Sequence, residues 1–184
     1  MTTRHLLLSL PLLSVAATAM ARGEYSGASS TSSPYVGASI GVLRYDESGL
    51  DTVDPSLIIA RIGFPISPYV ALEGRLGTGL ASSESGGNSV SVGTIGGAYV
   101  KGSLPLAPTF SLYGVAGIGT LTVNRNFGQG NSTDTGLSFG IGGDVVLPVN
   151  NLSLNFEWTH FPSGTDAGYS YDSNVLTAGV TWHF

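Results

Sequence analysis

Six charged residues stand inside stretches that are otherwise uncharged, and their chemistry is the first thing to explain. They are Arg61, Glu73, Arg75, Lys101, Asp144 and Glu157. Three are basic and three acidic, so an enclosed group of this kind can neutralise itself through ion pairs. We therefore expect a salt-bridged plug, with a gate or narrow ion path as the alternative. Paired carboxylates also serve glycoside hydrolysis, but an enclosed, ion-paired interior admits no sugar, so we set that chemistry aside.

A second group of charges is acidic and lies in polar connecting stretches, where Arg125 is the only base. Its members are Asp46, Glu47, Asp51, Asp54, Glu84, Asp134, Asp166 and Asp172. Carboxylates are ligands for divalent cations, but these lack the regular spacing and central glycine of a calcium loop. We therefore expect a solvated acidic surface, and the sequence predicts no metal site and no cofactor.

The composition excludes several classes of protein. The chain has 184 residues, a net charge of −5 and no cysteine, so disulfide scaffolds and thiolate metal sites are excluded. An acidic balance argues against a nucleic-acid partner, which requires a basic stripe. Only 10% of residues are charged, 27 are glycine, and no apolar run of about 20 residues follows the N-terminal region. Scattered hydrophobicity with high glycine is typical of a membrane β-barrel.

Eight segments alternate in side-chain character, as strands with one polar and one apolar face must. They are residues 35–45, 57–64, 69–79, 90–101, 110–122, 135–147, 152–161 and 175–184. In each segment that holds one of the six charges, the neighbouring apolar side chains lie on the opposite face. A charge on the lipid side at mid-depth would cost about 2–4 kcal/mol for Arg or Lys. The six charges are therefore predicted to point into the interior of a barrel, and glycines are predicted to make room for bulky inward side chains.

The connections between these segments alternate in length. Those at 65–68, 104–108 and 148–151 are short and contain proline. Those at 46–56, 80–89, 123–134 and 162–174 are longer and polar. Transmembrane barrels combine short turns at one end with long loops at the other and carry aromatic girdles at both interfaces. The predicted girdle residues are Tyr35, Phe64, Tyr69, Phe110, Trp182 and Phe184 at the short-turn end, and Tyr45, Trp158 and Phe161 at the other.

The N-terminal 21 residues have the pattern of a secretory signal peptide. Arg4 is followed by an apolar stretch from Leu6 to Ala17, and Ala19 and Ala21 form a small-x-small cleavage site. A membrane anchor is the alternative, but the apolar core is short for a span. We expect residues 1–21 to be removed, residues 22–34 to form a flexible Ser/Gly-rich leader, and residues 35–184 to form the barrel.

Several stretches resemble the small outer-membrane β-barrel proteins of Gram-negative bacteria, the group of the OmpA transmembrane domain, the OmpX/Ail proteins and the opacity-type proteins. They are PYVGASIG at 34–41, VALEGRL at 70–76, LYGVAGIGT at 112–120, FEWTHF at 156–161 and VTWHF at 180–184. The resemblance implies an all-β, eight-stranded antiparallel up-and-down transmembrane β-barrel with both termini in the periplasm. It also implies that Trp182 and Phe184 form the signal read by the outer-membrane assembly machinery.

The resemblance implies a non-enzymatic, monomeric surface protein of the outer membrane that contacts the lipid bilayer and lipopolysaccharide. Its four acidic external loops would serve adhesion or environmental contact by meeting a host or surface ligand. The alternative is a small passive or gated pore. A more distant alternative is a lipid A-modifying enzyme, since some such barrels use a His-x-Ser pair on the outer wall. Here His160 and Ser163 are one residue further apart, with Pro162 between them and Asp166 as the nearby acid.

Overall fold

The computed structural model describes residues 33–47, 55–85, 88–125, 132–149, 151–166 and 169–184. The strands are β1 (Tyr35–Glu47), β2 (Ser56–Ser67), β3 (Val70–Ala81), β4 (Ser83–Ser85), β5 (Asn88–Ala107), β6 (Phe110–Arg125), β7 (Ser132–Val146), β8 (Leu152–Asp166) and β9 (Tyr169–His183). None of the described residues belongs to a helix long and apolar enough to cross a membrane. The predicted signal peptide, with Ala19 and Ala21, and nearly all of the predicted leader lie outside the described residues.

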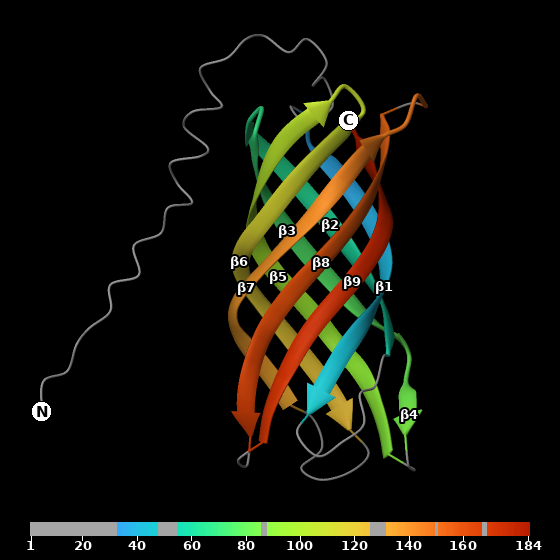
Figure 1. Ribbon diagram of the computed structural model, residues 1–184, viewed down its shortest axis with the longest axis vertical. Coiled ribbons are helices and arrows are strands. Elements are labelled where there is room, and N and C mark those ends of the chain that lie inside the picture. Colours follow the sequence, from blue (N-terminus) through green and yellow to red (C-terminus); the bar gives the residue numbers. More distant parts are fainter. Residues whose placement is uncertain (1–32, 48–54, 86–87, 126–131, 150, 167–168) are drawn as a thin grey trace, which may run out of the picture.

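Eight long strands form one closed antiparallel barrel, which confirms the predicted fold class (Figure 1). The sheet order is β3-β2-β1-β9-β8-β7-β6-β5, and β5 pairs back onto β3 to close the circle. The three-residue strand β4 continues the β3 side of this seam and also pairs with β5. Tyr35 pairs with His183, so the first and last strands meet at one end. We call this the terminal end and the opposite one the distal end.

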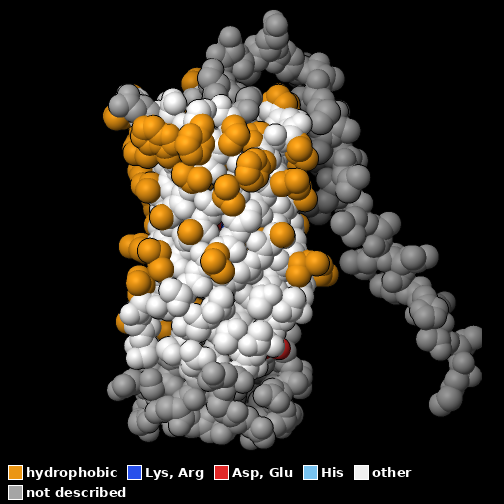
Figure 2. All heavy atoms as spheres, turned by 180° about the vertical axis from the view of Figure 1, so that it is seen from behind, with side chains coloured by type: hydrophobic (Ala, Val, Ile, Leu, Met, Phe, Trp, Pro, Cys, Tyr) orange, Lys and Arg blue, Asp and Glu red, His pale blue; other side chains and the backbone are white. Residues whose placement is uncertain are grey.

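Alternation of polar and apolar residues sets the two faces of the wall. Along β8, Ser153, Asn155 and Glu157 are buried in the interior, whereas Phe156 and Trp158 are 57% and 36% exposed on the outside. Because successive side chains point to opposite faces of a strand, the same division recurs in the other strands. Hydrophobic side chains therefore cover the outer surface and gather most densely towards the terminal end (Figure 2).

Two interior glycines make room for tyrosine rings. A Cβ atom on Gly63 would lie 1.9 Å from Cζ of Tyr35, and one on Gly142 would lie 2.4 Å from Cζ of Tyr113. Both distances are far inside van der Waals contact, so the two tyrosines fill the barrel only because these positions lack a side chain. Neither glycine has a positive φ, so the requirement is for space.

The distal connections differ from the predicted long loops. Strands β8 and β9 stay paired as far as Asp166 and Tyr169, and β4 and β5 as far as Ser85 and Asn88. The predicted loops at 162–174 and 80–89 are therefore wrong in extent. The backbone pairing between these strands continues because polar residues can occupy both faces of a hairpin that is surrounded by water. Of the other two predicted loops, residues 48–54 and 126–131 lie outside the described residues.

Several predicted girdle residues take other places. Tyr35 is 5% exposed and points into the barrel, and Phe161 is 1% exposed in the interior. Each lies on the inner face because it shares the parity of buried residues in its strand. Trp158 faces outward, as a girdle residue must, and β8 continues eight residues beyond it. Phe64, Trp182 and Phe184 are exposed on the outer wall near the terminal end.

Candidate functional site

The interior of the barrel contains two layers of different chemistry. The half nearer the terminal end holds the six charged residues. The distal half holds a cluster of buried apolar side chains, each at most 4% exposed. Its members are Leu43, Leu57, Ile59, Val92, Ile95, Leu121, Val123, Phe161 and Val175.

Glu157 on β8 is the centre of the charged layer. Arg75 from β3 reaches across the barrel and contacts both carboxylate oxygens, with Nη2 2.8 Å from Oε2. Arg61 from β2 lies 3.6 Å from the same carboxylate, and the hydroxyl of Thr159 donates to it at 2.5 Å. These side chains are almost completely buried, so the charges neutralise one another in a setting from which water is largely removed.

A second carboxylate extends the layer. Arg75 Nε donates to Glu73 Oε1 at 2.6 Å, and the hydroxyl of Tyr35 donates to Glu73 Oε2 at 2.7 Å. The guanidinium of Arg75 also lies 4.6 Å from the centre of the Tyr99 ring. Arg75 is thus held by two carboxylates and an aromatic face. One side chain thereby ties β3 to β8 through the middle of the barrel.

Lys101 and Asp144 form the third ion pair, with Nζ 2.7 Å from Oδ2. The ammonium group lies 3.9 Å from the centre of the Tyr113 ring and 5.4 Å from that of Tyr35. This pair is less enclosed than the others, because the side chains of Lys101 and Asp144 keep 10% and 17% exposure. Every one of the six charged residues singled out in the sequence therefore faces the interior and contacts an opposite charge.

Neutral polar side chains join the charged layer to the rest of the wall. Arg61 Nη2 donates to Ser39 Oγ at 2.9 Å, and Ser39 donates in turn to Asn155 Oδ1 at 3.2 Å. Asn155 Nδ2 then donates to Thr181 Oγ1 at 2.9 Å. This chain of bonds crosses β2, β1, β8 and β9. Most of the polar groups in this layer have a partner within the barrel, although Arg61 Nε and the hydroxyl of Tyr113 are buried without a hydrogen bond.

Sequence reasoning did not find the distal apolar layer. Alternation predicts one apolar face per strand, whereas distal segments are apolar on both faces. Leu57, Ile58 and Ile59 show this directly, since the first and third are buried inside and the second is 36% exposed outside. This run of consecutive apolar residues could have revealed the layer from the sequence. A strand with apolar surroundings on one side and a packed core on the other needs no polar face.

His160 lies on the outer wall of β8. Its Nδ1 donates to Asn174 Oδ1 at 3.1 Å, and its ring centre is 5.0 Å from that of Phe139. Pro162 falls in a register shift between Phe161 and Gly164. The side chains of Ser163 and Asp166 lie outside the described residues, so the structure brings no nucleophile to His160 that can be described. Within the described part of the chain, no three acidic or histidine side chains gather into a possible metal site.

Trp182 and Phe184 lie at the end of the last strand. Both face outward at 45% and 67% exposure, and the backbone N–H of Phe184 donates to the carbonyl of Pro34 at 3.0 Å. The end of the chain is therefore fastened to the start of β1. An exposed aromatic pair therefore lies on the outer wall at the end of the last strand.

Comparison with known proteins gives one family and a consistent set of similar folds. The sequence matches the model of the outer membrane protein beta-barrel domain over residues 6–184. Among solved structures, Neisserial surface protein A is similar with a TM-score of 0.63 at 16% identity, covering 82% of this chain and 97% of that one. OprG from Pseudomonas aeruginosa is similar with a TM-score of 0.53 at 11% identity, covering 84% and 97%.

A third similar structure is Ail, the attachment invasion locus protein of Yersinia pestis, in complex with the heparin analogue sucrose octasulfate. Its TM-score is 0.51 at 17% identity, and the match covers 82% of this chain and 99% of that one. At these identities the likeness concerns the fold. A sequence comparison with curated proteins finds no significant match.

Proposed function

Because this chain belongs to the outer-membrane β-barrel family of Gram-negative bacteria, we propose that it is a non-enzymatic surface protein that presents the distal end of a closed barrel to the medium. Short turns lie on the periplasmic side of such barrels, so the terminal end faces the periplasm and the distal end faces outward. The residues described as a mature barrel, 35–184, would follow a cleaved signal peptide and a short leader.

The filling of the interior is the observation that carries this proposal. Ion pairs occupy the periplasmic half, and an apolar cluster that includes the buried side chains of Leu43, Phe161 and Val175 occupies the external half. An eight-stranded barrel has an interior just wide enough for side chains to fill. An ion-conducting path would require the side chains of both layers to move apart at the same time. This favours a scaffold whose contacts are made by its outer surfaces over the pore considered from sequence.

The charge of the external end indicates which partner would fit there. Asp46, Glu84, Asp134 and Asp166 all lie at the distal ends of strands, where the sequence places the bases Arg44 and Arg125. Like charges across an interface are repulsive, and opposite charges steer association. Ail was solved with a sulfated ligand, but an acidic surface of this kind would repel sulfate. We therefore propose a basic partner, such as a lysine-rich protein segment on a cell or surface.

Binding to a basic probe tests this function. Vesicles containing the protein are mixed with fluorescent poly-lysine or with heparin at low salt. We expect poly-lysine to bind, heparin not to bind, and the triple variant Glu84→Gln, Asp134→Asn, Asp166→Asn to bind poly-lysine at least fivefold more weakly. Asp144→Asn is the matched control, since it removes one carboxylate from the interior and should leave binding unchanged. Equal binding by the triple variant, or preferential binding of heparin, would contradict the proposed partner.

A further inference from the structure

The pairing between β7 and β8 ends well before the distal ends of these two strands. Its last pair is Phe139 with His160, although β7 begins at Ser132 and β8 continues to Asp166. Beyond this pair β7 stays paired with β6, and β8 stays paired with β9. The distal wall therefore divides into two hairpins. In Figure 1 the distal part of β8 runs down at the front, whereas that of β7 passes with β6 to the back.

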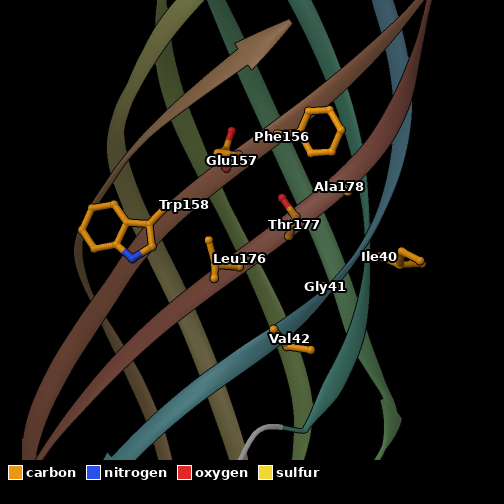
Figure 3. Close-up of a pocket in the computed structure, with 9 residues that line it drawn as sticks. All are labelled: Ile40, Gly41, Val42, Phe156, Glu157, Trp158, Leu176, Thr177 and Ala178. Atoms are coloured by element: carbon orange, nitrogen blue, oxygen red, sulfur yellow. The ribbon is translucent and has the colours of Figure 1, made fainter.

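A proline explains why the pairing stops. Just before the division β8 is a regular strand, and Figure 3 shows Glu157 and Trp158 on its opposite faces. The carbonyl of Leu152 accepts a hydrogen bond from Leu147 at the end of β7, so the even-numbered residues of β8 direct their backbone groups towards β7. The first even-numbered residue beyond the last pair is Pro162, which has no N–H to donate, and β8 shifts its register against β9 at the same place.

The opening exposes backbone groups of β7. The N–H of Val146 donates to Thr109 on the β6 side at 2.8 Å, and the N–H of Leu147 donates towards β8 at 2.9 Å. Backbone direction alternates along a strand, and the β6–β7 register has no shift, so the odd-numbered residues of β7 face the β8 side. No described residue of β8 pairs with β7 beyond Phe139. We call the three odd-numbered residues left there the open edge: Thr133, Thr135 and Leu137.

The open edge is extended and lies beyond the apolar part of the outer wall. Leu137 is 80% exposed, and its partner Ile118 on β6 is 59% exposed. The next two outward rows are polar, and each consists of two threonines whose hydroxyl groups are 2.9 Å apart. These rows are Thr120 with Thr135 and Thr122 with Thr133. Because β6 already holds the edge in a strand conformation, a partner would not have to order it on binding.

An unpaired strand edge is a template for an added strand. We infer that the basic partner of the proposed function binds in an extended conformation, as an added strand along the open edge of β7. Asp134 lies within this segment and Asp166 ends β8 on the other side of the opening, so lysine fits better than an acidic side chain. A second copy of this chain would bring Asp134 towards itself, which like charges disfavour. The inference rests on the proposed function and adds a binding mode to it.

The two faces of the open edge indicate the sequence pattern of the partner. Asp134 has the same parity as the buried Ser138, so its side chain belongs to the inner face of β7. Thr133 and Thr135 belong to the outer face. Residues directly opposite each other on adjacent strands share a face. A segment with lysine at every second position, alternating with threonine, therefore matches the edge better than a segment with its lysines in one block.

Hydrogen exchange with two peptides of identical composition tests this binding mode. The isotope-labelled protein is extracted from outer membranes in mild detergent and mixed at low salt with a peptide that alternates lysine and threonine, or with one whose lysines form a block. We expect the alternating peptide to bind at least fivefold more tightly. It should also slow exchange of the Thr133 and Thr135 amides at least tenfold. The amide of Asp134 is directed towards β6 and should exchange slowly with or without peptide.

A proline substitution tests the backbone contribution directly. Thr135→Pro removes one N–H of the open edge, and proline is tolerated on an edge strand. It should weaken binding of the alternating peptide at least fivefold and leave binding of the block peptide within twofold. Thr120→Val is the matched control, because it removes the same hydroxyl contact without changing β7, and it should leave the binding of both peptides unchanged. Each variant is first shown to be folded by its heat-dependent mobility in gels.

Two kinds of failure are distinguishable. Slow exchange of Thr133 and Thr135 in the free protein would overturn the inference, because the edge would already be covered. Binding of the alternating peptide without added protection, or equal binding of the two peptides, would overturn it and leave the proposed function standing. If neither peptide bound and poly-lysine did not bind either, the proposed function would fail, and the inference with it.

Discussion

Single residues contribute strongly to the stability of this interior because they form buried ion pairs. Glu157 interacts with Arg75, Arg61 and Thr159, which come from three strands. The inward direction of the charge was predictable because both of its neighbours are large and apolar. Its partners were not, because the distance between Glu157 and Arg75 depends on which strands face each other across the closed barrel. Sequence alternation gives a side-chain direction but no cross-barrel distance.

Removing the central carboxylate should destabilise the barrel strongly. In Glu157→Gln, two guanidinium groups lose a buried partner, and breaking such a pair costs about 3–5 kcal/mol. Urea unfolding of the protein in lipid vesicles measures the change. Asp144→Asn is the comparison, and a smaller loss is expected because the Lys101–Asp144 pair is partly exposed. A Glu157→Gln protein as stable as Asp144→Asn would show that the network is not tightly enclosed.

Alanine substitutions at two glycines distinguish a steric clash in the interior from the general effect of adding a methyl group to a strand. Gly63→Ala would place a carbon 1.9 Å from the Tyr35 ring, and overpacking of this kind costs about 1–3 kcal/mol. Gly102→Ala meets nothing within 4 Å and should change stability by less than about 0.5 kcal/mol. The same unfolding measurement compares the two. Equal stability of both variants would mean that Tyr35 does not occupy the interior as described.

At the level of the strands, alternation was a good guide within the membrane and a poor one outside it. Residues 152–161 alternate clearly, and β8 includes all of them. The strand then continues to Asp166, past Pro162 and a register shift. Polar sequence predicts a loop there because a hairpin in water has no apolar face to reveal it. Cross-strand pairing, which sequence does not show, holds the extension together.

Hydrogen exchange tests the extended hairpin of β8 and β9. The paired residues Thr165 and Ser170 belong to the ladder, so their amides that donate within it should exchange at least tenfold more slowly than unstructured reference rates. Nuclear magnetic resonance of the protein in micelles provides the measurement. Amides of the buried β9 segment near Thr177 are the protected reference. Exchange at the unstructured rate throughout 164–171 would instead support the long loop predicted from sequence.

At the scale of the whole molecule, two stacked layers of side chains fill one narrow barrel. The closed eight-stranded topology was predicted because segment number, alternation and connections agreed. The apolar external layer was not, since a single-face pattern was assumed for every strand. This layer favours a closed scaffold over a pore, because an ion entering from the distal end would meet Leu43 and Phe161 before it reached the six interior charges.

Single-channel recording in a planar bilayer tests this closed interior most directly. The protein is extracted from outer membranes and its insertion is verified by protection from external protease. We expect no conductance steps, because ion pairs and the apolar layer together fill the part of the interior that the structure describes. Reproducible steps of uniform size from inserted protein would contradict it and would instead support a pore gated by Arg61, Arg75 and Glu157.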